Sequence, residues 1–189
     1  MKVKGKSTVS IIGGADGPTS IYLTVGTGKK TRKERIRQYI YKCKRQRMEK
    51  RIFAGAHTLK EVVKYANKKY QAVEISKSER RYVKHRKNLR ENLIITNKPE
   101  LLGEMIANIP DREMPMDYHI YEIRIDGGHM TIEIDYIWDI FGISYSGNKK
   151  AMRQFRKIGQ DLNMYYGVTE EDIKNKSQRY EALLAVLSR

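Results

Sequence analysis

The sequence predicts an α+β protein, and three patterns carry this prediction. Two segments combine strand-forming residues with glycine-containing turns, which is typical of β-hairpins. Several others repeat apolar residues every three or four positions, which is typical of amphipathic helices. Of the 189 residues, 40% are hydrophobic, so the chain can bury a core. We therefore expect an N-terminal β-hairpin, a basic helical region, a second β-hairpin and two C-terminal helices.

The first hairpin is expected at residues 7–12 and 19–25. Both segments are rich in β-branched and aromatic residues, which favour strands. The glycine-rich turn between them contains Asp16 and Pro18, residue types that are common in tight turns.

A long helix is expected from Thr31 to about Phe53. Thr31 and Glu34 have the spacing of a capping box, in which each side chain bonds the backbone N–H of the other residue. Apolar residues follow at helical spacing and are predicted to face inward: Ile36, Tyr39, Ile40 and Cys43.

Two more helices are expected before residue 98. Thr58 and Glu61 repeat the capping-box spacing and begin a helix that ends near Tyr70. After an extended piece at 72–75, Ser76 and Glu79 begin a third helix. The inward residues of these two helices are predicted to be Leu59, Val62, Val63 and Ala66, then Tyr82, Val83, Leu89 and Leu93. We expect the three helices to form one basic cluster.

The remainder of the chain is expected to contain a short helix, a hairpin and two helices. Residues 97–108 favour the short helix, and Pro110 and Pro115 bracket an irregular linker. Segments 118–126 and 129–135 alternate apolar and polar residues around Gly127 and Gly128, which predicts a hairpin. The closing helices are expected at 148–162 and from Thr169 to the C-terminus, the latter with Ile173, Tyr180, Leu183, Leu184 and Leu187 on its apolar side.

Charge is distributed unevenly along the chain. The net charge is +16. Residues 1–98 contain 27 basic and 7 acidic residues, a net charge of +20, whereas residues 99–189 contain 11 basic and 15 acidic residues, a net charge of −4. The sequence therefore predicts a basic region at 1–98 and a mildly acidic region at 99–189, with a domain boundary near residue 98.

The basic region is predicted to bind nucleic acid. The 23 residues from Lys29 to Arg51 contain 12 basic and 2 acidic residues, and clustered cations attract phosphates through counterion release. The predicted phosphate contacts are Lys33, Arg35, Arg37, Lys44, Arg45, Arg47 and Arg51, extended by Arg80, Arg81, Lys84, Lys87 and Arg90. Tyr39 and Tyr41 are predicted to stack on unpaired bases.

Other interpretations remain open for these residues. A solvated helix and a helix that meets an acidic protein fit the same charges, and a tyrosine at helical spacing is often core. An anionic membrane is less favoured, because helices that lie on membranes carry bulky apolar residues on the free face. Asp126, Glu133 and Asp135 around His129 are the candidate carboxylates of a metal-dependent nuclease. The four histidines and Cys43 do not have the spacing of metal ligands, so we predict no cofactor, no metal and no catalytic residue.

Composition also bounds the setting of the protein. Cys43 is the only cysteine, and the N-terminal residues lack the apolar stretch of a signal peptide. No apolar run approaches the roughly 20 residues that cross a bilayer as a helix. The sequence therefore predicts a protein of the bacterial host cytoplasm, with self-association possible through the mildly acidic region.

The segment from Ser10 to Ile21, SIIGGADGPTSI, carries two resemblances. It resembles a short motif of the membrane-embedded beta subunits of sodium-translocating decarboxylases, in which the aspartate belongs to the ion path; this chain has no spans around Asp16, so ion pumping does not carry over. The segment from Gly13 to Thr19, in a short lysine-rich chain, also resembles phage and mobile-element proteins, among them anti-CRISPR proteins that inhibit Cas9. This second resemblance implies a ribonucleoprotein partner.

Overall fold

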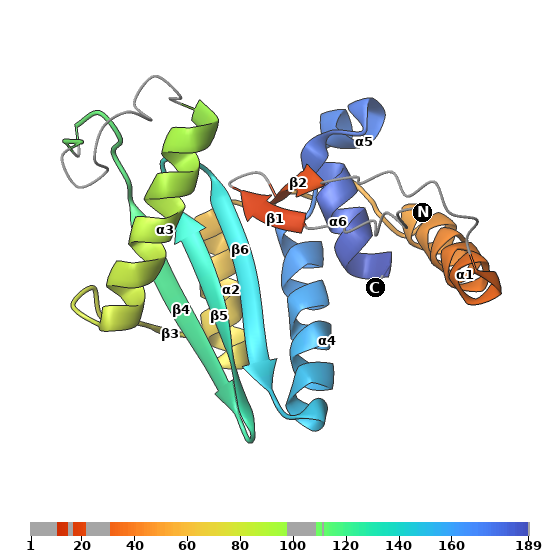
Figure 1. Cartoon of the computed structure of the whole chain (residues 1–189), viewed down its shortest axis with the longest axis horizontal. Helices are drawn as coiled ribbons and strands as arrows, with labels where there is room; N and C mark the ends of the chain where they lie inside the picture. The colour runs from red at the N-terminus through yellow and green to blue at the C-terminus, as the bar shows by residue number, and fades with distance from the viewer. Residues whose placement is uncertain (1–10, 15–16, 22–30, 98–108, 111, 189) are drawn as a thin grey trace, which may run out of the picture.

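The computed structural model describes residues 11–14, 17–21, 31–97, 109–110 and 112–188. The described helices are α1 (Arg32–Glu49), α2 (Leu59–Tyr70), α3 (Arg80–Asn97), α4 (Lys149–Tyr166), α5 (Glu170–Asn175) and α6 (Gln178–Ser188). The described strands are β1 (Ile11–Gly14), β2 (Gly17–Ile21), β3 (Val73–Glu74), β4 (Tyr118–Ile125), β5 (Gly128–Asp135) and β6 (Ile140–Gly147). The predicted α+β class is confirmed (Figure 1).

A four-stranded antiparallel sheet in the order β3-β4-β5-β6 is the centre of the fold. Strands β4 and β5 form the predicted hairpin, in register from Tyr118 opposite Asp135 to Ile125 opposite Gly128. The turn between them contains Gly127 at φ 80°, a backbone conformation that glycine adopts at little cost. The predicted extended piece at 72–75 is β3, which pairs with β4 at the edge of the sheet.

Helices α2 and α4 cover one face of this sheet. Alternate strand residues such as Met130 and Ile132 point to this face and are fully buried, because a strand presents successive side chains to opposite sides. They pack against Leu59 and Ala66 of α2 and Phe155 of α4. The capping box at Thr58 and the predicted inward residues of α2 are confirmed.

Helix α3 covers part of the opposite face. Tyr82 packs there on Tyr118 and Ile120 of β4, and the Tyr82 hydroxyl donates a hydrogen bond to the Tyr118 carbonyl at 2.7 Å. Further along the helix, Leu93 and Ile94 are buried against Ile140 of β6.

The remaining helices form a separate group beside the sheet unit (Figure 1). Residues of α6 such as Leu183 and Leu184 are buried together with Ile52, which follows α1, and Val168, which precedes α5. In α1 the capping box at Thr31 is confirmed, and Arg45 of α1 forms an ion pair with Glu181 of α6.

Four details of the predicted fold are wrong. The third helix does not begin at Ser76, because the Glu79 N–H donates to the Ser76 carbonyl in a turn and α3 starts at Arg80. Strand β6 was not expected, so the second hairpin is part of a larger sheet. The expected final helix is divided into α5 and α6, because Lys176 adopts a left-handed conformation at φ 48° that ends α5. The three N-terminal helices do not form one cluster, because α2 and α3 lie on opposite faces of the sheet and α1 packs on α6.

The packing shows where in the fold the change of net charge at residue 98 lies. Strand β3 precedes this residue and pairs with β4, which follows it. Helix α2, which precedes residue 98, shares a buried cluster with α4, which follows it. The change of charge therefore falls inside the sheet unit. The short helix expected at 97–108 and much of the predicted first hairpin lie outside the described residues, but β1 and β2 do form an antiparallel pair.

Asp161 of α4 joins α4 to α2 through three contacts to one carboxylate oxygen. It accepts hydrogen bonds from the Tyr65 hydroxyl at 2.8 Å, the Tyr70 hydroxyl at 2.7 Å and Lys69 Nζ at 2.9 Å. Burial by itself raises the pKa of Asp161, but the hydrogen bonds from Lys69 and the two tyrosines outweigh it and lower the pKa below its ordinary value.

We expect the Asp161→Asn variant to be less stable than the wild type by about 1 to 2 kcal/mol at pH 7, because hydrogen bonds to a charged group are lost. A carboxyl whose pKa is lowered in the folded state stabilises the protein above its unfolded pKa of about 3.9, and this stabilisation fades as pH falls through the folded pKa. The difference between variant and wild type should therefore shrink in acid. Urea unfolding at pH 7 and pH 3 measures it. Asp126→Asn in the exposed β4–β5 turn is the matched control, and an Asp161→Asn deficit that is equal at both pH values would contradict the role of the carboxylate.

Candidate nucleic-acid interface

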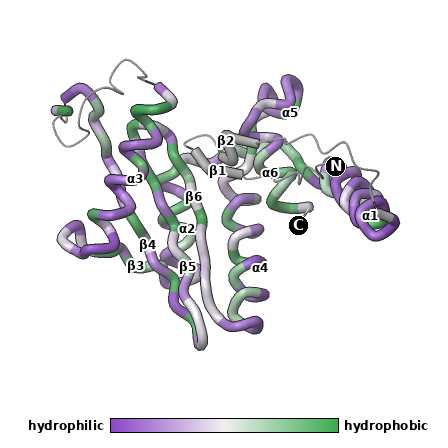
Figure 2. Tube along the Cα trace, viewed as in Figure 1, coloured by the Kyte–Doolittle hydropathy of each residue, from purple (hydrophilic) through white to green (hydrophobic). Residues whose placement is uncertain are grey.

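Helix α1 is the most exposed helix of the described chain and carries seven of the predicted phosphate contacts on or next to it. None of its residues is buried. Figure 2 shows that α1 is hydrophilic along most of its length, whereas α6 beside it is largely hydrophobic. Helix α1 contacts α6 through Met48 and Arg45, which lie in the last turns of α1.

The exposed apolar residues of α1 differ from the prediction. Ile36, Tyr39 and Ile40 were expected to pack inward, but their exposed fractions are 51%, 70% and 49%; only Cys43 of that set is partly covered. The physical reason is that the expected neighbours, α2 and α3, bury their apolar sides on the sheet.

Five cations lie on one side of α1 and its C-terminal extension. They recur at steps of three, four and seven residues, spacings that return to the same side of a helix. We call them the α1 cation row: Lys33, Arg37, Lys44, Arg47 and Arg51. All five are exposed, and none forms an ion pair with another residue of the described chain. This row is free to meet phosphate groups.

The two other predicted contacts of α1 have different surroundings. Arg35 is exposed but lies away from the row. Arg45 is half-buried and bonded to Glu181 and Glu49, and the hydrogen bond from Arg45 to Glu181 raises the pKa of the guanidinium. Arg45 therefore holds α1 against α6.

The predicted contacts of α3 are not continuous with those of α1. The two helices lie at opposite ends of the molecule (Figure 1). Arg80, Lys84 and Lys87 are exposed, whereas Arg90 donates a hydrogen bond to the Ile109 carbonyl. Val83 was expected to face inward and is 56% exposed. The structure therefore does not bring the twelve predicted cations into one track.

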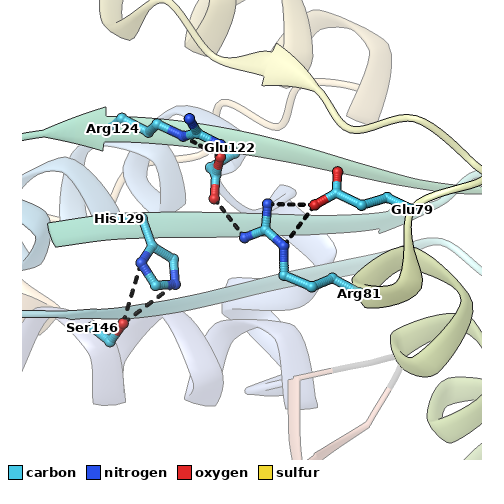
Figure 3. A network of polar contacts seen from close by, with 6 residues as sticks. All are labelled: Glu79, Arg81, Glu122, Arg124, His129 and Ser146. Atoms are coloured by element: carbon cyan, nitrogen blue, oxygen red, sulfur yellow. Dashed lines mark hydrogen bonds and ion pairs between the residues drawn. The ribbon is translucent and has the colours of Figure 1, made fainter.

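Arg81 belongs to a network on the sheet face that α3 leaves partly open (Figure 3). It forms ion pairs with Glu79 at 2.8 Å and with Glu122 at 2.7 Å, and Glu122 also accepts from Arg124. Burial by itself raises the pKa of Glu122, but hydrogen bonds from Arg81 and Arg124 outweigh it and lower the pKa. Arg81 thus joins α3 to β4.

The candidate carboxylates do not gather around His129. The Glu133 carboxylate accepts from the Tyr118 hydroxyl at 2.5 Å, and Asp135 accepts from the backbone N–H groups of Ile137 and Trp138. His129 lies beside Ser146 of the neighbouring strand, 3.3 Å from its hydroxyl oxygen (Figure 3). Within the described residues no group of three potential ligands is placed to hold a metal ion.

A basic surface that was not predicted lies on α4. Its five cations, Lys149, Lys150, Arg153, Arg156 and Lys157, are all exposed. Their spacing was legible in the sequence, but summing charge over residues 99–189 concealed it, because that region contains 15 acidic residues and only Asp161 of them lies on α4.

In the described part of the chain, no helix has the length and apolar character that crossing a membrane requires. Comparison with protein-family models, with curated proteins and with solved structures finds no match to this chain.

Proposed function

We propose that this chain is a non-enzymatic nucleic-acid-binding protein that docks electrostatically through α1. The observation that supports this proposal is the α1 cation row, whose five members are exposed and form no ion pairs within the described chain. Ordinary solvated surfaces intersperse both signs of charge. A row of a single sign attracts a phosphate backbone, because binding releases the counterions condensed on it.

The class of nucleic acid that α1 fits best is single-stranded. Tyr39 and Tyr41 lie among the cations with exposed fractions of 70% and 40%, and an exposed aromatic ring can stack on a base only where the base is not already stacked in a duplex. Single-stranded regions occur in free strands and in ribonucleoproteins alike.

The more specific form of the proposal is inhibition of a CRISPR–Cas9 effector by a mobile-element protein. Its support is the resemblance of Gly13 to Thr19 together with the basic α1, since such an effector exposes guide RNA and a displaced DNA strand. An assay of DNA cleavage by a Cas9-type complex, with and without the chain, tests this form. Unchanged cleavage at saturating chain would reject it and leave the binding proposal standing.

The binding proposal is tested by fluorescence anisotropy with a labelled 20-nucleotide oligo(dT) between 50 and 300 mM salt. Each phosphate contact to a single strand contributes about 0.7 to the slope of log K against log salt, so the five-membered row predicts a slope of about −3.5. Vesicles with and without anionic lipid serve as the membrane comparison. No binding at 50 mM salt, a flat slope, or binding to the anionic vesicles alone would reject the proposal.

Stacking gives a prediction that is separate from charge. Tyr39→Ala should weaken binding to oligo(dT) by about 1 to 3 kcal/mol, the range measured for base–aromatic stacking. Tyr39→Phe keeps the ring and should bind as the wild type does. Anisotropy at a fixed salt concentration compares the two, and equal losses in both variants would remove stacking from the mechanism.

A further inference from the structure

Helices α2 and α4 present a second basic surface, on the side of the molecule that faces away from the sheet. Eight cations make up this surface, which we call the two-helix basic face: Lys60, Lys64 and Lys68 of α2, and Lys149, Lys150, Arg153, Arg156 and Lys157 of α4. All eight are exposed.

Helical geometry fixes where these cations point. On α4 they recur at steps of one, three and four residues, on the side opposite the buried residues Ala151, Phe155 and Leu162. On α2 they lie at steps of four, opposite the buried Leu59, Val62 and Ala66. Since the buried sides of both helices pack on the same face of the sheet, the two sets of cations face outward together.

Contacts near the C-terminal end of α4 fix α2 and α4 relative to each other. Asp161 of α4 accepts hydrogen bonds from Tyr65 and Tyr70 of α2. The Tyr165 ring is stacked between the rings of His57 and Tyr65, with centroid separations of 4.0 Å on both sides. Packed helices have axes about 8 to 10 Å apart. The face is therefore a platform about two helices wide, supported by the sheet.

The acids near this platform are few. Glu61 of α2 is exposed and lies close enough to Lys64 for their charges to interact, whereas α4 contains a single acid, Asp161. None of the eight cations forms an ion pair at bonding distance within the described chain. Lys60 Nζ lies 6.0 Å from the ring centre of Tyr136. Asp161 of α4 forms an ion pair with Lys69, which does not belong to the face. Within the described chain, the platform therefore has an excess of positive charge, which attracts a polyanion.

We propose that the two-helix basic face binds the phosphate backbones of double-stranded nucleic acid. This inference rests on the proposed function and adds a second contact surface to it. The aromatic residues of α2 and α4 are all partly or fully buried, so this face offers charge to phosphates rather than exposed rings to unstacked bases. A duplex places its charges on the outside in two strands, which a flat platform two helices wide contacts at several points. Helix α1, with its exposed tyrosines, suits a single strand instead.

The test compares two sets of glutamine substitutions on the full chain. The α4 set is K149Q, K150Q, R153Q, R156Q and K157Q, and the α1 set replaces the five members of the α1 cation row. The probes are a 20-base-pair DNA duplex and oligo(dT) of the same length. The α4 set should weaken duplex binding at least tenfold at 100 mM salt and reduce the salt slope by up to about 4.5, at 0.9 per phosphate contact, while binding to oligo(dT) changes less than threefold.

A charge-conserving control keeps the result interpretable. Exchanging lysine for arginine at Lys149, Lys150 and Lys157, and arginine for lysine at Arg153 and Arg156, should preserve duplex binding, because the contacts are to charge and not to bases. Circular dichroism and thermal melting confirm that each variant is folded. An unchanged duplex slope in the α4 set would overturn the inference while the α1 proposal stands, whereas a wild-type chain that binds neither probe would overturn both.

Discussion

Glutamine at the five positions of the α1 cation row is expected to reduce the affinity for oligo(dT) at least about 100-fold at 100 mM salt. Each phosphate contact to a single strand adds about 0.7 to the salt slope, so losing five contacts removes about 3.5 from it. The effect should be large because the five cations have no ion-pair partner in the described chain, so their charges are available to phosphates.

Two features of α1 make this substitution informative. Glutamine has nearly the helix propensity of lysine and arginine, so α1 should keep its conformation. Arg45 remains unchanged and continues to hold α1 on Glu181. Lys174→Gln, at an exposed lysine of α5, is the control and should change binding little. Retention of wild-type affinity by the five-position variant would show that α1 is not the interface.

The second large effect is expected in the core of the sheet unit. Phe155 of α4 is fully buried and packs with residues of α2 and β5. Phe155→Ala removes this contact and leaves a cavity, which typically costs about 3 to 5 kcal/mol. At about 2 to 4 °C per kcal/mol for a chain of this size, the melting temperature should fall by roughly 10 °C.

This substitution also tests whether the sheet unit unfolds as one body across residue 98. The buried cluster around Phe155 includes Leu59, from the basic region, and Met130, from the mildly acidic region. We therefore expect α2 and the strands to unfold in one transition that shifts as a whole, followed by tyrosine fluorescence and circular dichroism. Phe53→Ala, at a side chain that is 77% exposed, is the control and should change stability by less than about 0.5 kcal/mol. Two separate transitions on either side of residue 98 would contradict a single unit.

Local signals in the sequence predicted most of the elements. The capping boxes predicted at Thr31 and Thr58 and the helix start predicted at Thr169 each begin a helix, because these signals depend on residues close together in the sequence. The β4–β5 hairpin was predicted for a similar reason, since alternation and the turn at Gly127 lie within one short segment.

The elements that were missed depended on weaker or longer-range signals. In β6, Phe141, Ile143 and Tyr145 alternate with glycine and serine and pack toward α2 and α4; this alternation was available in the sequence but was not used. The burial of α1 was mispredicted because periodicity shows which side of a helix is apolar without showing whether a partner covers it. The separation of α1 from α3 depends on the order of packing around the sheet, which no local pattern encodes.

The candidate site could likewise be predicted from the sequence only in part. The cations of α1 were predicted from a run of charge, and six of the seven are exposed. The roles of Arg45 and Arg81 in ion pairs across the fold required Glu181 and Glu122 as partners, which are more than 40 residues away in the sequence. The cations of α4 were concealed because net charge was summed over a region instead of over one side of one helix.

Photo-crosslinking distinguishes base stacking on α1 from binding elsewhere on the chain. A 4-thiothymidine oligonucleotide bound to the chain reacts under long-wavelength light with side chains that stack on its bases, and mass spectrometry locates the adduct. The tryptic peptide 38–42 contains both Tyr39 and Tyr41. If α1 is the interface, adducts form on this peptide and disappear at high salt. Adducts confined to 170–188, or no adducts under conditions where the oligonucleotide is bound, would contradict an interface on α1.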